Sequence, residues 1–470
     1  MRCLFTLLLA AVASVAGAQS NFTTVIDLPA DLVELTADIG PGTQVNVHAG
    51  GQTAAGTSGD RLEVGSAMGG AASELNVLGG AVGAFTKLYG NATLNAHSGV
   101  VGDDLLAEAG SQVNLHGGQV GERFTASGAE VLIDGAAVGF DASFNDGAAV
   151  TMHSGSIDSS MQLLGSRFDL HGGQIGGGAE ARSHSEMNIY GGTVLGRLDV
   201  YQESSITIHD GDINQLFVVS GSKIALQGGV VQDRIQAWGG TVDITGGHTQ
   251  VIDIVQGGIV NLSGGGVDYL NVFGQSTSGA ANTLRLFGGD LPEQNVAVHD
   301  NAAIAFFGTG FALDGVAIEG LAYGQTTTIS QRDVALAGEL ADGSAFSYQL
   351  NSIFDDQTGL WFSPGAAVTV TTILAGDFNA DGQVDAADYS VWRDNLGAAV
   401  TLPGDVTPGS ISELDYEVWR NNLGAVFAGF GVAGVHPTPE PHLLTLAALG
   451  AGMLTMTRRP REDNLLNRCS

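Results

Sequence analysis

The sequence predicts an all-β protein: a parallel β-solenoid (β-helix) of 18 to 19 residues per turn, followed by a small α-helical module. Three observations carry this prediction. A motif returns with that period, apolar and polar residues alternate within each copy, and glycines close most copies. Glycine makes up 71 of 470 residues, which is about twice the usual share and suits a chain that bends sharply at regular intervals.

The repeat dominates residues 19–290. Residues 45–48, VNVH, return as LNAH at 94–97 and as VNLH at 113–116, each time followed by a bend that contains glycine. The first and third positions are apolar and must point inward, because successive residues of a strand face opposite sides. A chain that coils with this period pairs each turn in parallel with its neighbours, so we expect a solenoid stabilised by a continuous aliphatic column.

Strand patterns continue between residues 291 and 374, although the period fades. Two runs, 334–340 and 344–350, flank the turn pair Asp342-Gly343 and predict a β-hairpin. We expect this segment to form the end of the solenoid and a β-rich cap over its open end.

Two outward-facing columns of the repeat are polar. The second strand position often carries Asn or Asp, as at Asn76, Asn95 and Asn114. Two interpretations stay open: the columns bind a ligand such as sugar hydroxyls or a soft metal, or they are a solvated face repeated by duplication. The fourth strand position holds six histidines, of which the middle four form the candidate ligand ladder: His48, His97, His116, His153, His171 and His209.

The repeat lacks residues with defined catalytic roles. Lys87 and Lys223 are the two lysines and stand in separate turns, and the adjacent acids Asp103 and Asp104 are expected to point to opposite faces of a strand. Glycosidases need two opposed carboxylates. The sequence favours a non-catalytic solenoid over the alternative, a secreted polysaccharide-degrading β-helix enzyme, lyase or glycosidase, tethered by its C-terminal module.

An oxygen-rich loop opens the helical module, residues 375–426. When Asp377 is counted as position 1, Gly382 falls at position 6 and permits a sharp turn. The spacing predicts a Ca²⁺ site, with Gln383 acting through its carbonyl and Asp385 through water. Oxygen-bearing residues stand at positions 1, 3, 5, 7, 9 and 12: Asp377, Asn379, Asp381, Gln383, Asp385 and Asp388.

A helix with Tyr389 and Trp392 on one face follows this loop, and the same helix pattern returns 27 residues later with Tyr416 and Trp419.

The loop before the second helix is one residue shorter than the first loop, and it lacks some of the first loop's oxygen-bearing residues. We expect it to be a weak second site, and we expect the module to have a core separate from that of the solenoid. The candidate ligands of the second site are Asp405, Thr407, Ser410 and Asp415.

These two loop–helix units resemble the type I dockerin duplication over residues 376–425. The resemblance implies two bound Ca²⁺ ions, a cohesin-like partner module, and a role in attachment or assembly. Because the second loop departs from the pattern, docking through both units is less expected than docking through the first. The competing interpretation is a calcium-stabilised structural terminus.

The ends of the chain carry two targeting patterns. Residues 1–18 combine Arg2, a short apolar stretch and the small residues Ala16-Gly17-Ala18, which predicts a secretory signal peptide. After a linker at 427–438, Pro439-Glu440-Pro441 precede an apolar run and the basic pair Arg458-Arg459. This order resembles the PEP-CTERM sorting tail over residues 439–462, which implies an exosortase partner and transient membrane association.

Charge and cysteine content agree with export. A formal net charge of −32 argues against nucleic acid as a partner. The two cysteines, Cys3 and Cys469, lie in the predicted signal and after the sorting tail, so we expect no structural disulfide. The sequence therefore predicts an exported structural or binding protein of the cell envelope, cell surface or extracellular matrix, with polysaccharide as a candidate partner.

Overall fold

The computed structural model describes residues 22–28, 35–59, 61–201, 203–274, 279–321, 323–407 and 409–427. The predicted signal peptide, most of the linker and the sorting-tail residues lie outside this part, so those predictions remain untested. The tail residues concerned are Pro439, Glu440, Pro441, Arg458 and Arg459. The described residues from Phe22 to Ala425 belong to one compact unit.

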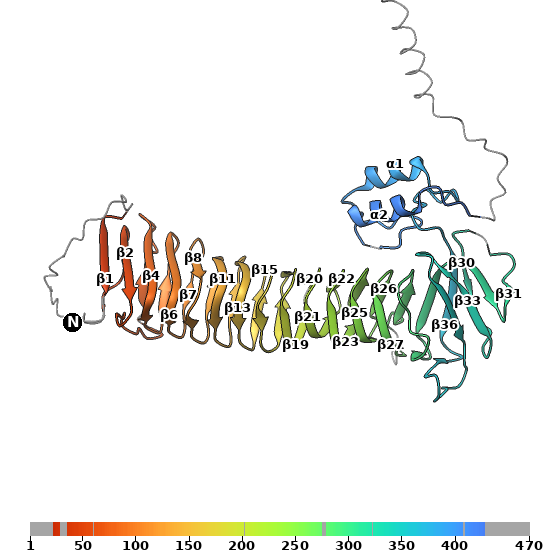
Figure 1. Cartoon of the computed structure of the whole chain (residues 1–470), viewed down its shortest axis with the longest axis horizontal. Coiled ribbons are helices and arrows are strands. Elements are labelled where there is room, and N and C mark those ends of the chain that lie inside the picture. The colour runs from red at the N-terminus through yellow and green to blue at the C-terminus, as the bar shows by residue number, and fades with distance from the viewer. Residues whose placement is uncertain are drawn as a thin grey trace, which may run out of the picture. The chain divides into compact units, whose positions relative to one another are not determined.

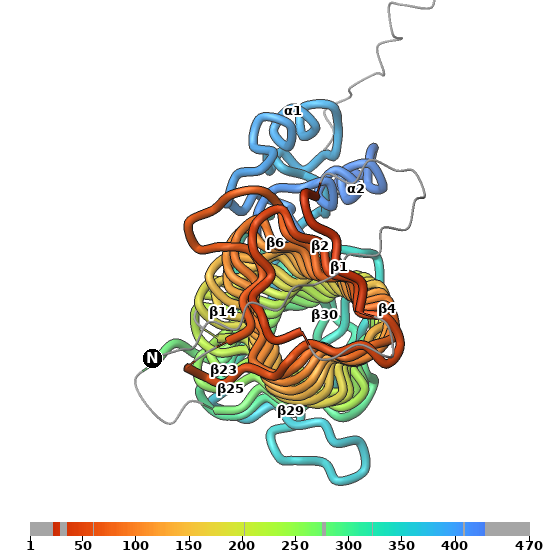
Figure 2. Tube along the Cα trace, turned by 90° about the vertical axis from the view of Figure 1, so that its left-hand side faces the viewer, coloured from red at the N-terminus to blue at the C-terminus, as the bar shows by residue number. Residues whose placement is uncertain are grey.

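The predicted parallel β-solenoid is confirmed, with about 14 turns. Figure 1 shows the turns side by side, and Figure 2 looks along the coil, where successive turns superpose. The register is regular from turn to turn: Val45 pairs with Leu75, Leu75 with Leu94, and Leu94 with Val113. The repeat therefore places equivalent residues in columns.

Most strands of the solenoid fall into two rows, and within a row each strand pairs with the equivalent strand of the next turn. The first row, which carries the polar columns, is β1 (Thr24–Leu28), β2 (Thr43–His48), β4 (Ser73–Val82), β6 (Ala92–Val101), β8 (Gln112–Leu115), β11 (Glu130–Val138), β13 (Ala149–Ile157), β15 (Arg167–Leu170), β18 (Glu186–Ile189), β20 (Ser205–Ile208), β22 (Lys223–Leu226), β24 (Thr241–Ile244), β26 (Ile259–Leu262), β28 (Thr283–Leu286), β30 (Ala303–Leu313) and β36 (Ala367–Thr372). The second row is β3 (Leu62–Val64), β5 (Thr86–Leu88), β7 (Leu106–Ala107), β10 (Thr125–Ser127), β12 (Ser143–Asn145), β14 (Met161–Leu164), β17 (Ala179–Arg182), β19 (Thr193–Val200), β21 (Asp212–Val219), β23 (Val230–Trp238), β25 (His248–Val255), β27 (Gly266–Val272), β29 (Val296–Val298) and β35 (Trp361–Phe362). Two short strands, β9 (Gln119–Val120) and β16 (Gln174–Ile175), lie between the rows.

The inward column forms the core. Aliphatic residues at the first and third positions are fully buried. Three buried phenylalanines also contact one another in the core: Phe124 meets Phe144 edge to face, Phe144 meets Phe168 at a tilt, and both pairs of centroids are 5.8 Å apart. Burial of a large apolar side chain contributes roughly 1.5–3 kcal/mol. Summed over the turns, this column explains how the solenoid holds together without a disulfide.

The corner after the first row requires glycine. Gly118 has a φ of +81°, and a Cβ on Gly117 would lie 2.6 Å from the carbonyl oxygen of His97 in the preceding turn. Any side chain at Gly117 would therefore force the two turns apart. The glycine pair therefore marks the bend that the repeat predicts.

Antiparallel strands cover the last turns. The predicted hairpin is present as β33 (Ala335–Leu340) and β34 (Ala345–Gln349). Its Phe346 stacks on Phe306 of β30 at 4.6 Å, which joins the hairpin to the solenoid core. Two short strands complete this region, β31 (Val316–Ala317) and β32 (Thr326–Thr328).

The two predicted helices are also present: α1 (Ala386–Asn395) and α2 (Glu413–Asn422). They enclose a small core of Phe378, Trp392 and Ile411. The expectation that this core is separate was only half right. A second cluster joins Phe287 of the solenoid to Ala375 and Val406 of the module, and Ala375 follows the end of β36 by only three residues.

Within the described part of the chain, neither helix is long and apolar enough to cross a membrane.

Candidate functional site

The first loop of the helical module buries two carboxylates. Asp377 and Asp388 have no exposed surface, and loop N–H groups surround them. Asp377 accepts hydrogen bonds from Asp381 N (3.1 Å) and Gly382 N (2.7 Å). Asp388 accepts from Asn379 N (3.0 Å) and from Asp385 N (2.8 Å). These bonds wrap the loop around both acids.

In the described part of the chain, the buried acids of this loop have no cationic partner. Among the described residues, no Lys, Arg or His forms an ion pair with Asp377 or Asp388. Burial raises the pKa of Asp388, and the neighbouring negative charges of Asp377 and Asp381 raise it further. Burying unpaired charge is unfavourable, so the loop has the excess of negative charge that a bound cation would neutralise.

The other predicted ligands of the first loop are more accessible. Asn379, Asp381 and Asp385 are exposed, and Gln383 is half-buried. The Asp385 carboxylate caps α1 by accepting from Ala387 N at 2.7 Å. The structure therefore brings the predicted residues into one loop, where two acids are buried and the remaining oxygens lie at the rim.

Tyr323 contacts this loop from the solenoid cap, which the sequence analysis did not foresee. Its hydroxyl donates to Asp377 Oδ2 at 2.5 Å and accepts from Leu374 N at 3.0 Å. Burial raises the pKa of the Tyr323 hydroxyl, and the bond to Asp377 raises it further, so the group remains a donor at neutral pH. These residues are 54 positions apart, and no local pattern signals the pairing.

The second loop repeats the buried acid pair. Asp405 and Asp415 are 5% and 1% exposed, and Asp405 Oδ2 has no hydrogen-bond partner among the described residues. Burial, together with the negative charge of Asp415, raises the pKa of Asp405 to about 7. Thr407 joins the two acids, since its hydroxyl donates to Asp415 at 2.7 Å. Ser410 is exposed and forms no described hydrogen bond to either acid.

The donor chemistry of the loops fits a hard cation such as Ca²⁺, because all candidate ligands are oxygens. In the described part of the chain, no group of three or more His, Cys, Asp and Glu side chains is already gathered to hold a metal. In the first loop, the carboxylates are instead hydrogen-bonded to loop amides. The loops thus offer oxygen donors and unbalanced charge, and calcium binding itself stays a prediction.

The asparagine column of the solenoid is a hydrogen-bonded ladder. Asn76 donates to Asn46 at 2.8 Å, Asn95 to Asn76 at 2.9 Å, and Asn114 to Asn95 at 2.8 Å. At its start, Asn46 donates to Asp27 at 2.9 Å. Because the amides bond to one another from turn to turn, this column is better explained as structural than as a ligand site.

The histidine column consists of stacked rings. His97 lies on His116 with centroids 5.1 Å apart, and His153 lies on His171 at 5.0 Å. Tyr190 and His209 extend the second stack at 4.7 and 4.6 Å. Within each stack the ring faces cover one another and leave edges toward solvent, which disfavours the stacking of sugar rings on this column.

The acidic pair Asp103-Asp104 was expected to point to opposite faces, and this was wrong. Both carboxylates face Arg123, at 3.9 and 2.8 Å. Asp104 has a φ of +59°, so the pair lies at a corner and not within a strand. Each acid therefore belongs to a surface ion-pair network around Arg123.

No protein-family model, curated protein or solved structure matches this chain. The resemblances to dockerins and to the PEP-CTERM tail therefore rest on the motifs alone.

Proposed function

We propose that this chain is an exported structural or binding protein of the cell surface or extracellular matrix, whose helical module binds Ca²⁺ and serves attachment or assembly. The observation that carries the proposal is the repeated pair of buried acids: Asp377 with Asp388, and Asp405 with Asp415. Four carboxylates buried without a described cationic partner favour a divalent cation.

The first loop is the stronger candidate. Asp377, Asn379, Asp381 and Asp388 would hold the ion together with the carbonyl of Gln383. Bound calcium supplies positive charge that holds the loop closed, and the loop in turn fixes the start of α1. The second loop offers Asp405, Asp415 and Thr407, and so has fewer oxygens for the ion. We therefore propose a tight first site and a weak second one.

Attachment follows from the position of the module in the chain. A module placed between a solenoid and a predicted sorting tail suits a protein held at the cell surface. The resemblance to dockerins supports a cohesin-like partner, and the predicted tail supports sorting by an exosortase. The enzyme alternative has less support, because the adjacent acids Asp103 and Asp104 both face Arg123 and do not form a pair of opposed carboxylates.

Calorimetric titration of the full chain with Ca²⁺ tests the proposal. We expect Asp381→Ala to abolish the tight site, because the carboxylate at position 5 is lost. The matched control, Thr407→Ala, removes a hydroxyl from the second loop and leaves the tight site unchanged. Equal loss in both variants, or no heat of binding in the unmodified chain, would contradict the proposal.

A further inference from the structure

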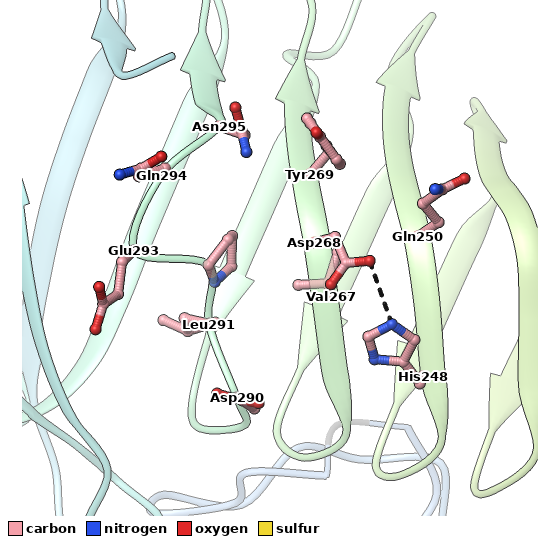
Figure 3. A pocket seen from close by; sticks show the side chains of 11 residues that line it. His248, Gln250, Val267, Asp268, Tyr269, Asp290, Leu291, Glu293, Gln294 and Asn295 are labelled. Carbon is pink, nitrogen blue, oxygen red and sulfur yellow. Dashed lines mark ion pairs between the residues drawn. The ribbon is translucent and has the colours of Figure 1, made fainter. Parts of the chain in front are cut away.

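One groove on the solenoid combines an exposed aromatic ring with polar side chains, and it lies far from the calcium loops in the sequence. It has a volume of about 550 Å³, within the range of small-molecule sites. Figure 3 shows that β25 and β27 form its floor, and that the segment leading into β29 forms one wall. Its lining includes His248, Gln250, Asp268, Tyr269, Glu293 and Asn295.

The wall exists because residues 290–295 depart from the regular turn. Gly266 and Asp290 are bridged in register, and Leu270 later pairs with Val296, so the wall segment holds two more residues than the turn before it. The additional length displaces Pro292 and Glu293 from the sheet. In the sequence, the two additional residues of this segment appear only as an interruption of the 18-residue period.

Hydrogen bonds from the cap hold the wall segment in place. The hydroxyl of Tyr348, a residue 2% exposed, donates to the carbonyl of Pro292 at 2.9 Å. Asn295 N donates to the carbonyl of Thr358 at 2.8 Å, and the carbonyl of Asn295 accepts from Leu270 N at 3.0 Å. A groove held by such bonds loses little conformational freedom when a ligand enters.

The groove offers a ring and many hydrogen-bonding groups. Tyr269 is 43% exposed, so part of its ring is open to a ligand. Gln250, Gln294 and Asn295 provide amides that donate and accept, while Asp290 and Glu293 provide acceptors. Sugars present apolar ring faces together with hydroxyls. The aromatic ring can stack on the apolar faces, and the amides and carboxylates can form hydrogen bonds with the hydroxyls.

The charge of the groove selects among sugars. His248 Nε2 lies 3.4 Å from Asp268 Oδ2 (Figure 3), and Asp290 and Glu293 add two more carboxylates to the lining. Neither Lys nor Arg occurs among its described lining residues. A uronate or sulfate group would therefore be repelled by the carboxylates of this groove and would find no cationic side chain of Lys or Arg there.

A second groove on the solenoid offers less to a sugar. Its lining includes Gln119, Ser156, Asp158 and Gln174, and it has no aromatic residue.

We propose that the groove around Tyr269 binds a segment of an uncharged polysaccharide chain without cleaving it. This inference goes beyond the proposed calcium-dependent attachment and does not depend on it. Tyr269 stacks on a sugar ring, and the amides of Gln250 and Asn295 bond to its hydroxyls. The solenoid thus becomes a binding surface as well as a scaffold.

Calorimetric titration of the full chain with cellohexaose, laminarihexaose, mannohexaose and hexagalacturonate tests this site. We expect at least one neutral hexasaccharide to bind, with unchanged affinity in EDTA, and hexagalacturonate to bind at least tenfold more weakly. Tyr269→Ala should weaken the neutral sugar at least tenfold. Tyr190→Ala is the matched control, since Tyr190 is similarly exposed, at 41%, but lies on the histidine column.

A second variant, Gln250→Ala, removes one exposed amide and should weaken binding severalfold while the circular dichroism spectrum stays unchanged. The proposal is overturned if no neutral sugar binds, if hexagalacturonate binds as well, or if Tyr190→Ala has the same effect as Tyr269→Ala. Shortening of the probe would also overturn it, because the groove would then be an active site. If the chain bound the neutral sugar but no calcium, the sugar-binding proposal would stand, and only the proposed calcium-dependent attachment would be contradicted.

Discussion

The indole nitrogen of Trp392 on α1 donates a 2.7 Å hydrogen bond to the carbonyl oxygen of Ser412, the residue that caps α2. The relationship is reciprocal, because Trp419 on α2 donates at 2.7 Å to the carbonyl of Asp385, which caps α1. Each helix thus holds the start of the other. The duplicated tryptophan therefore has a structural purpose that its spacing alone does not reveal.

Trp392→Phe should loosen both helices. It removes one donor and leaves the Ser412 carbonyl without its partner, which costs about 2 kcal/mol. Hydrogen exchange of the α1 and α2 amides should accelerate by about 30-fold, measured by mass spectrometry. Trp361→Phe is the control, since the Trp361 indole also donates to a backbone carbonyl, that of Ser352, but in the cap. An equal effect of both changes would contradict the reciprocal arrangement.

Tyr323→Phe should weaken calcium binding while leaving the fold intact. The hydroxyl of Tyr323 orients the Asp377 carboxylate, and partners that orient a metal ligand typically contribute 10- to 100-fold in affinity. We expect about a tenfold weaker tight site in a Ca²⁺ titration of the full chain.

Tyr89→Phe provides the matched control for this change, because Tyr89 also donates to a carboxylate, Glu63, at 2.7 Å in an early turn. Its calcium affinity should equal that of the unmodified chain. Unchanged affinity in Tyr323→Phe would mean that the contact between cap and loop is only a packing contact.

Asn95→Ala should destabilise the early turns of the solenoid. Asn95 both donates to Asn76 and accepts from Asn114, so the change removes two bonds of roughly 1 kcal/mol each. Urea unfolding followed by circular dichroism should show a lower midpoint. Thr207→Ala lies in the same column without a described ladder bond and should have a much smaller effect. If Thr207→Ala were equally harmful, the ladder would contribute nothing beyond side-chain packing.

The sequence predicted features that repeat or that depend on neighbouring residues. The inward column, the glycine corners and the hairpin at Asp342-Gly343 follow from local alternation and turn chemistry. The two helices follow from the spacing of their aromatic residues, Tyr389 with Trp392 and Tyr416 with Trp419. These features need no knowledge of which distant segments meet.

The features that sequence reasoning missed depend on contacts between distant segments. The bond of Tyr323 to Asp377 and the groove at Tyr269 arise where the regular coil ends and the cap folds back. The stacking of His153 on His171 could be placed in a column, but the orientation of the rings could not. Asp104 was misjudged because its positive φ depends on a corner that the strand pattern does not mark.

Hydrogen exchange of the full chain, compared in Ca²⁺ and in EDTA, tests the central claim most directly. In EDTA we expect faster exchange at the amides of Asn379, Asp381 and Gly382, which bond to the buried acids, and in α1. The solenoid strands should be unaffected away from the contacts at Phe287 and Tyr323. Identical exchange of the loop amides in both conditions would contradict a calcium-binding module.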